Sequence, residues 1–247
     1  MKRLLDFLIS LTGLIICSPI LVPIIIIVWI QDWHSPFYIA NRVGKGDKVF
    51  KMIKLRSMII NAHKSGVDST SSNDSRITGV GRFIRRYKLD ELSQLWNVLL
   101  GDMSLVGPRP NVKRETDLYT REEKKLLTVK PGITDFSSIV FSDEGDILKD
   151  TSDPDIAYNQ LIRPWKSRLG IFYIDHRTIQ TDLQLIYLTV IAVLSRDKAL
   201  QNISVSLANL GADPELVRVS RRIDQLVPTP PPGSNKIVSN RDGRVDD

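Results

Sequence analysis

Two adjacent carboxylates and one constrained arginine are the residues of this sequence best suited to chemistry. Asp90 and Glu91 stand at the start of the run LDELSQLWNVLLGDMSLVGPRP, and Arg109 lies near its end between Pro108 and Pro110. An aspartate can act as a nucleophile, and a neighbouring carboxylate can supply the hard oxygen ligands that Mg2+ prefers. An arginine between two prolines presents a planar fork suited to a phosphate. The combination favours phosphoryl transfer.

The spacing around the carboxylates predicts a helix over residues 80–99. Apolar side chains recur on one face, at Leu89, Leu92, Trp96 and Leu99. Asp90, Gln94 and Asn97 fall on a polar face, so the pattern predicts that Asp90 points away from the core.

A simpler reading of the same helix needs no chemistry. Asp90 could pair with Arg86, and Glu91 with Lys88, as ordinary surface ion pairs worth roughly 0.3–0.5 kcal/mol each. An Asp-Glu dipeptide taken alone does not decide between the two readings.

Four stretches of the chain resemble the bacterial sugar transferase family, the monotopic phosphoglycosyl transferases. They cover roughly residues 2–190 in family order: KRLLDFLISLTGLIICSPILVPIIIIVWI, NRVGKGDKVFKMIKLRSM, GRFIRRYKLDELSQLWNVLLGDMSLVGPRP and VKPGIT. The resemblance implies an enzyme that moves a sugar 1-phosphate from a nucleotide-diphosphate sugar, a UDP-sugar, to polyprenol (undecaprenyl) phosphate. It also implies a covalent aspartyl intermediate and a role in starting surface glycan synthesis.

The resemblance assigns roles to particular residues. It makes Asp90 the nucleophile, Glu91 the ligand of Mg2+ (or Mn2+), and Arg109 a phosphate-binding residue. Further phosphate-binding candidates, each of which could equally be a solvated surface cation, are Lys54, Arg56, Arg82 and Arg85. Tyr173 and Asp182 match a C-terminal signature of the family more weakly. The sequence PGITDFSS departs from the family's usual PGITG, which leaves the sugar open.

An uncharged run of 24 residues, Phe7–Ile30, precedes the polar part of the chain. As a straight helix it would be about 36 Å long, enough to cross a hydrocarbon core of roughly 30 Å, so a simple membrane span is one reading. Pro19 and Pro23 argue for a bend instead, because each removes a backbone donor within the helix. Ser18 can bond to a carbonyl freed by that bend.

Charge placement favours a helix that enters one leaflet and returns. Lys2 and Arg3 hold the N-terminus in the cytoplasm by the positive-inside rule. Activated sugar donors are cytoplasmic, so the rest of the chain should lie on that side too. The resemblance implies the same re-entrant path, broken at Ser18-Pro19. The expected location is the cytoplasmic face of the bacterial inner membrane.

The remaining pattern predicts an α+β, mainly helical fold. FYIANRVGKGDKVFKMIKL reads as a small β-hairpin turning at residues 44–47, and residues 61–75 read as a polar loop. Helices are expected at 112–127, 155–174 and 183–194, whereas 136–149 is left open. The apolar stretch 187–194 is either core or an interfacial helix. The expected domains are a membrane helix (1–34), a catalytic domain (35–200) and an extension (201–247), disordered from about 228.

Charge gives the main alternative to catalysis. Residues 41–88 carry twelve basic and three acidic side chains, which would attract any anionic partner. A membrane-tethered basic binding or scaffold protein is therefore the rival interpretation. Nucleic acid is not an expected partner, since no aromatic stacking platform or known nucleic-acid motif accompanies the charge. One cysteine, Cys17, excludes an internal disulfide, and three scattered histidines (His34, His63, His176) form no zinc spacing. The oligomeric state is left open.

Overall fold

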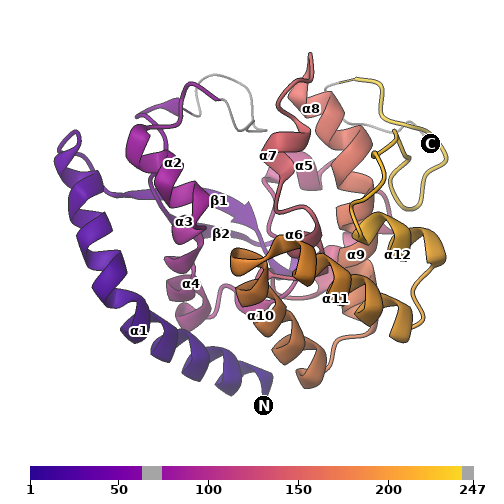
Figure 1. Cartoon of the computed structure of the whole chain (residues 1–247), viewed down its shortest axis with the longest axis horizontal. Coiled ribbons are helices and arrows are strands. Elements are labelled where there is room, and N and C mark those ends of the chain that lie inside the picture. Colours follow the sequence, from indigo (N-terminus) through magenta and orange to yellow (C-terminus); the bar gives the residue numbers. More distant parts are fainter. Residues whose placement is uncertain (63–73, 241–247) are drawn as a thin grey trace.

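The computed structural model describes residues 1–62 and 74–240. Its first element, α1 (Lys2–Ile30), is one continuous, curved helix along the flank of the molecule (Figure 1). Pro19 and Pro23 both lie inside it, and the Ser18 hydroxyl donates to the Ile15 carbonyl at 2.7 Å. Within the described ranges, α1 is the one helix long and apolar enough to cross a membrane. The re-entrant path stays a prediction.

The predicted β-hairpin is confirmed. Strands β1 (Phe37–Val43) and β2 (Val49–Leu55) pair antiparallel, with Ala40 opposite Met52. A short 3-10 turn, η1 (Lys45–Asp47), joins them. The predicted loop at 61–75 lies mostly outside the described residues.

The single helix predicted over 80–99 is wrong. Three short helices replace it, namely α2 (Gly79–Arg86), α3 (Leu89–Leu92) and α4 (Leu95–Leu100). The chain breaks at Lys88, whose φ of 55° is left-handed and therefore incompatible with a continuous helix. Tertiary contacts override the helical period here. The helix predicted at 112–127 is likewise only two short pieces, α5 (Lys113–Thr116) and η3 (Glu123–Thr128).

A second, parallel pair of strands lies beside these helices. β3 (Ser104–Val106) pairs with β4 (Gly132–Thr134). The segment left open at 136–149 contains α6 (Phe136–Val140) and α7 (Glu144–Ile147).

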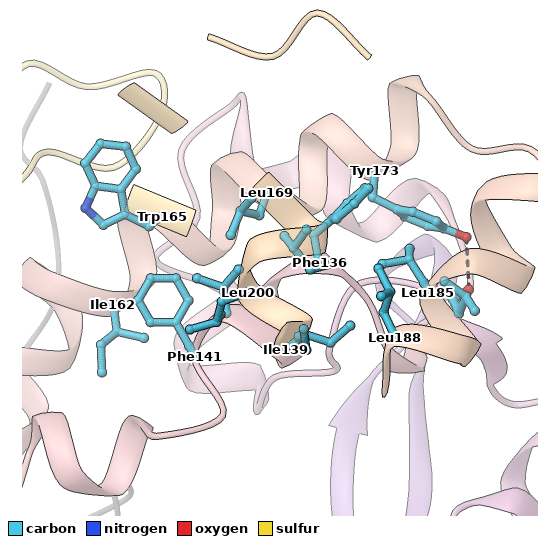
Figure 2. Packing of buried hydrophobic residues seen from close by; sticks show 14 of the residues in the cluster. Phe136, Ile139, Phe141, Ile162, Trp165, Leu169, Tyr173, Leu185, Leu188 and Leu200 are labelled. Carbon is cyan, nitrogen blue, oxygen red and sulfur yellow. Dashed lines mark hydrogen bonds between the residues drawn. The ribbon is translucent and has the colours of Figure 1, made fainter. Parts of the chain in front are cut away.

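The C-terminal half is helical, as predicted for 155–174 and 183–194. It comprises α8 (Pro154–Ala157), a π turn η4 (Tyr158–Ile162), α9 (Arg163–Asp175), α10 (Ile179–Leu194), α11 (Arg196–Asn209) and α12 (Pro214–Ser220). Figure 2 shows the main core, where Phe136 and Phe141 meet apolar residues of α9, α10 and α11. On α10, Leu185 and Leu188 are buried, whereas Tyr187, Val190 and Leu194 are exposed. The 187–194 stretch thus has both a core face and a free apolar face.

Residues 228–240 differ from the expected disorder. They lack regular secondary structure but contact the helical half: the Thr229 amide donates to the Gln160 carbonyl at 3.0 Å, and the Gln160 side chain donates to the Val238 carbonyl at 2.6 Å. Val238 is fully buried. A proline-rich segment can pack without forming a helix or strand, because its φ angles are already fixed and its carbonyls remain free to accept.

Candidate active site

The structure brings the two carboxylates and two cations into one cluster from three separate elements. Lys54 of β2 places its Nζ 3.7 Å from the Asp90 Oδ2. Arg109, in the loop after β3, places its Nη2 2.8 Å from the Glu91 Oε1. All four side chains are partly accessible, with exposed fractions of 14–32%. These pairings replace the pairs with Arg86 and Lys88 that the simpler reading of the sequence expects.

The segment that carries the carboxylates is fixed to the hairpin by Ser93, which caps the C-terminus of α3, and by Asn97 of α4. The Ser93 hydroxyl donates to the Asp90 and Ile53 carbonyls, at 2.9 and 3.2 Å. The Asn97 amide donates to the Lys51 carbonyl at 2.7 Å and accepts from the Ile53 amide at 2.9 Å. The predicted solvent-facing polar stripe is therefore wrong for Gln94 and Asn97, which are buried, while Trp96 is exposed. Asn97 occupies both a donor and an acceptor of the β2 backbone, which explains its burial.

The loop that carries Arg109 is held by the PGIT motif. The Gly107 amide donates to the Thr134 carbonyl at 2.9 Å, and the Gly132 amide donates to the Pro108 carbonyl at 3.0 Å. A Cβ atom on Gly132 would lie 2.1 Å from the Gly107 nitrogen, so the two backbones touch directly. Only glycine permits this approach. Two motifs far apart in sequence thus form one rigid support for Arg109.

The N-terminal turn of α1 is tied to the same strand. The buried Asp6 carboxylate accepts from the Ser104 hydroxyl at 2.9 Å and from the Leu105 amide at 3.1 Å. Lys2 pairs with Asp182 at 2.5 Å, and the Tyr173 hydroxyl donates to Asp182 and to the Val106 carbonyl. Tyr173 and Asp182 therefore support the strand end before Gly107. Their contacts join the N-terminus of α1 to the end of β3.

Mutual charge sets the ionisation of the cluster. Burial alone would raise the pKa of Glu91, but the charges of Arg109, Lys88 and Lys54 outweigh it and lower that pKa to about 2. Burial and the charge of Arg109 lower the pKa of Lys54 to about 8. The Glu91 charge raises the pKa of Arg109. At neutral pH the site holds an ionised carboxylate and a charged arginine beside a lysine close to its titration range.

The other predicted phosphate-binding residues separate into distinct environments. Arg85 donates to the Ser57 hydroxyl at 3.0 Å; burial lowers the pKa of Arg85, against the opposing charge of Asp90. Arg82 is exposed on α2. Arg56 pairs with Asp32 at 2.6 Å and donates to the Val28 carbonyl at 3.2 Å. Arg56 therefore links the chain after β2 to the C-terminal end of α1.

Two charged residues that the sequence analysis did not select as site residues, Glu144 and Lys88, also border the cluster. Glu144 of α7 pairs with Lys166 of α9, and the charges of Lys166, Arg109 and Lys88 lower the pKa of Glu144 despite its burial. Lys88 also donates to the Ser142 carbonyl at 3.4 Å. Glu144 lies in the segment whose mixed pattern gave no period to read, so its place became visible only in the fold.

The side chains of the cluster show which residues could bind a metal ion. Over the residues that the structure describes, no group of three or more His, Cys, Asp or Glu side chains could by itself hold a metal. Asp90 and Glu91 provide adjacent carboxylates, and Glu91 is ionised at neutral pH. This pair suits Mg2+, which commonly takes one or two carboxylates and fills its shell with substrate phosphate and water. His34 and His176 lie on separate elements, and His63 is outside the described residues.

Comparison with known proteins identifies the family of this chain. A family model described as "Bacterial sugar transferase" matches residues 1–196. A Bacillus subtilis (strain 168) protein, provisionally named an undecaprenyl-phosphate N-acetylgalactosaminyl 1-phosphate transferase, is 45% identical over 49% of this chain and 68% of its own length. The UDP-N-acetylgalactosamine-undecaprenyl-phosphate N-acetylgalactosaminephosphotransferase of Aeromonas hydrophila is 32% identical over 74% of this chain.

A Salmonella typhimurium undecaprenyl-phosphate galactose phosphotransferase is 35% identical over 81% of the chain. The chain spans only 43% and 41% of the Aeromonas and Salmonella proteins. The similarity therefore covers a shared part of those longer proteins.

Proposed function

Because this chain belongs to the bacterial sugar transferase family, we propose that it transfers a sugar 1-phosphate from a nucleotide-diphosphate sugar to polyprenol phosphate. The observation that carries the proposal is the cluster of Asp90 and Glu91 against Lys54 and Arg109. A diphosphate substrate brings several negative charges, and this cluster offers cations for them beside a carboxylate nucleophile. The names of the relatives favour undecaprenyl phosphate as the acceptor and a UDP-sugar as the donor.

The proposed chemistry proceeds in two displacements. Asp90 attacks the sugar-bearing phosphorus of the donor; the new bond joins its carboxylate oxygen to phosphorus, and the bond to the leaving nucleoside monophosphate breaks. The phosphate oxygen of polyprenol phosphate then attacks the same phosphorus. This second step releases Asp90 and yields the polyprenol diphosphate sugar.

The neighbouring side chains have supporting roles in this proposal. Arg109 binds the phosphate oxygens through its planar fork, and its pairing with Glu91 orients it before substrate arrives. Lys54 lies beside Asp90, where its charge favours the ionised carboxylate. Glu91 would hold Mg2+ (or Mn2+), and the ion would neutralise charge on the diphosphate.

The acceptor lipid places the reaction at a bilayer surface. Helix α1 presents exposed apolar side chains along its length, and Trp29 and Trp33 lie at its end, where aromatic rings favour the interface. We propose that α1 enters and leaves the cytoplasmic leaflet. A cysteine added before Met1, and Asn41→Cys, both in a Cys17→Ser background, should resist an impermeant thiol reagent on intact cells and react once the membrane is opened. Labelling of residue 41 from outside would refute this topology.

A panel of nucleotide sugars tests the activity itself. Purified protein is incubated with each donor, Mg2+ and polyprenol phosphate, and release of the nucleoside monophosphate is measured. One donor class should give turnover that requires the lipid acceptor. The rival interpretation, a basic binding or scaffold protein, would be favoured by tight membrane binding with no turnover for any donor.

A further inference from the structure

Two arginines, Arg196 and Arg222, pair with Asp143 in the turn between α6 and α7, next to the segment that carries Asp90 and Glu91. Arg196, at the start of α11, places its Nη2 2.8 Å from the Asp143 Oδ2, and Arg222, after α12, places its Nη2 3.3 Å from the same oxygen. Arg196 also donates to the Ser142 hydroxyl at 3.3 Å and to the Val140 carbonyl at 3.4 Å. Arginines from two different parts of the chain therefore share one carboxylate oxygen of Asp143.

Arg222 is built into this contact rather than resting on the surface. Its side chain is 9% exposed, and its guanidinium lies 5.4 Å from the centroid of the buried Phe141 ring. Figure 2 shows Phe141 inside the main core beside Ile162 and Leu200. The Arg222 backbone is left-handed, with φ of 54°, a conformation that costs roughly 1 kcal/mol for a side chain of this kind. The surrounding contacts must therefore compensate for that backbone strain.

The turn at residues 141–144 touches the active site. The Ser142 carbonyl accepts from Lys88 at 3.4 Å, and the Lys88 carbonyl accepts the amide of Glu91 at 3.1 Å. On the other side of Asp143, Glu144 pairs with Lys166 and lies within electrostatic range of Arg109. The turn therefore joins the support of α3 to the surroundings of the phosphate-binding arginine.

We propose that Arg222 is a positioning residue for sugar-phosphate transfer, acting through Asp143 to hold the 141–144 turn against Lys88 and Arg109. The inference rests on the proposed function. The family match ends at residue 196, so Arg222 contacts Asp143 from the part of the chain beyond the match. The C-terminal extension thereby helps to position the active site.

Kinetics of nucleoside monophosphate release test the proposal on the 247-residue chain in membranes. Arg222→Gly removes the guanidinium and relieves the left-handed backbone, so it should fold with a Tm near wild type. Its kcat/KM for the nucleotide sugar should fall about tenfold, mainly through KM, because the turn borders the group that binds the donor phosphates. Asp143→Asn should fall to a similar extent, and Arg222→Lys should recover part of the loss.

The double variant Arg222→Gly with Asp143→Asn decides whether the two act together. If Arg222 works through Asp143, the double variant is no slower than the slower single variant. Arg218→Ala, on α12 with a side chain 53% exposed, is the matched control and should behave as wild type. Unchanged kinetics in Arg222→Gly, or losses that multiply in the double variant, would overturn the inference. Wild-type protein inactive with every donor would instead overturn the proposed function.

Discussion

Two glutamate–arginine pairs in this molecule show how the same chemical pair serves opposite purposes. Glu123 and Arg163 are 0% and 4% exposed, and their side chains meet through two contacts at 3.0 and 2.7 Å. Glu91 and Arg109 are 18% and 32% exposed and meet through one contact at 2.8 Å. The first pair is closed to solvent, and the second remains open to a ligand.

The partners around each pair extend the difference. Glu123 also accepts from the Ser167 hydroxyl at 2.7 Å and from the Thr120 amide at 3.0 Å, while Arg163 donates to the Leu118 carbonyl at 2.7 Å. The buried pair is thus satisfied by fixed protein groups. Glu91 and Arg109 instead lie among Lys54, Lys88 and Asp90, an excess of charge that a substrate phosphate or a metal ion can share. The open pair can therefore bind a further charged group, and this property distinguishes the candidate site from the buried pair.

The largest expected effect comes from the nucleophile beside the open pair. Asp90→Asn keeps the shape of the side chain but removes the attacking carboxylate, so turnover should fall by at least about a thousandfold. Incubation with donor alone, followed by intact mass measurement, should show a sugar-phosphate adduct in wild type that is absent in Asp90→Asn. Undiminished turnover in this variant would exclude Asp90 as the nucleophile.

The contrast between the two pairs is tested most directly by making the same substitution in each pair. Glu91→Gln should lower activity on the order of a hundredfold with little change in Tm, because the site loses a charged ligand for the metal and the partner of Arg109. Glu123→Gln should do the reverse: replacing the buried, ionised partner of Arg163 with a neutral amide costs about 3–5 kcal/mol, a Tm decrease on the order of 10 °C. Equal effects of the two substitutions on both readouts would show that burial does not separate structural from functional pairs here.

Removal of divalent cations is the companion test of Glu91. Activity should disappear with excess chelator and return with Mg2+ or Mn2+, whereas the Tm should hardly change, because no described cluster supplies a complete metal site without substrate. Glu215→Gln, at an exposed position on α12, should keep the wild-type response to Mg2+. Full turnover in chelator would rule out the metal role.

Replacing the open arginine gives a smaller effect. Arg109→Lys keeps the charge but loses the planar fork, so kcat/KM should fall about tenfold, equivalent to about 1.4 kcal/mol of transition-state stabilisation. Arg163→Lys in the buried pair should chiefly lower the Tm. A fully active Arg109→Lys variant would show that only the positive charge of this residue is needed.

The smallest expected effect tests whether the charge of Lys54 is needed for activity. Burial lowers the pKa of Lys54 to about 8, so the ammonium is charged below that pH and loses its proton as the pH rises through it. If the charge is needed, kcat/KM should be about half its plateau at pH 8 and about a tenth at pH 9. In Lys54→Arg the alkaline limb should move upward, since the guanidinium stays charged. An unchanged limb would assign the titration to another group.

Local chemistry in the sequence predicted several features that the structure bears out. The hairpin followed from alternating residues around a glycine-containing turn, and the helices at 155–174 and 183–194 followed from their period, because both signals act over a few neighbouring residues. Asp90, Glu91 and Arg109 were selected because they stand in one short run that resembles the bacterial sugar transferase family, and their roles stay predictions. The long apolar run likewise defined α1 by composition alone.

The tertiary structure decided what lies next to what. The predicted 80–99 helix is interrupted at Lys88, and Gln94 and Asn97 are buried. Arg56 pairs with Asp32. Both outcomes depend on β2 and the end of α1, which supply partners that lie far away in sequence. The tertiary structure also placed Ser142 and Glu144, from the segment 136–149 whose pattern was left open, beside Lys88 and Arg109, and it paired Asp143 of the same turn with Arg222. Side-chain type and local spacing fix which groups can react. Contacts between distant elements fix which of them meet, since that choice depends on burial and backbone hydrogen bonds across the whole fold.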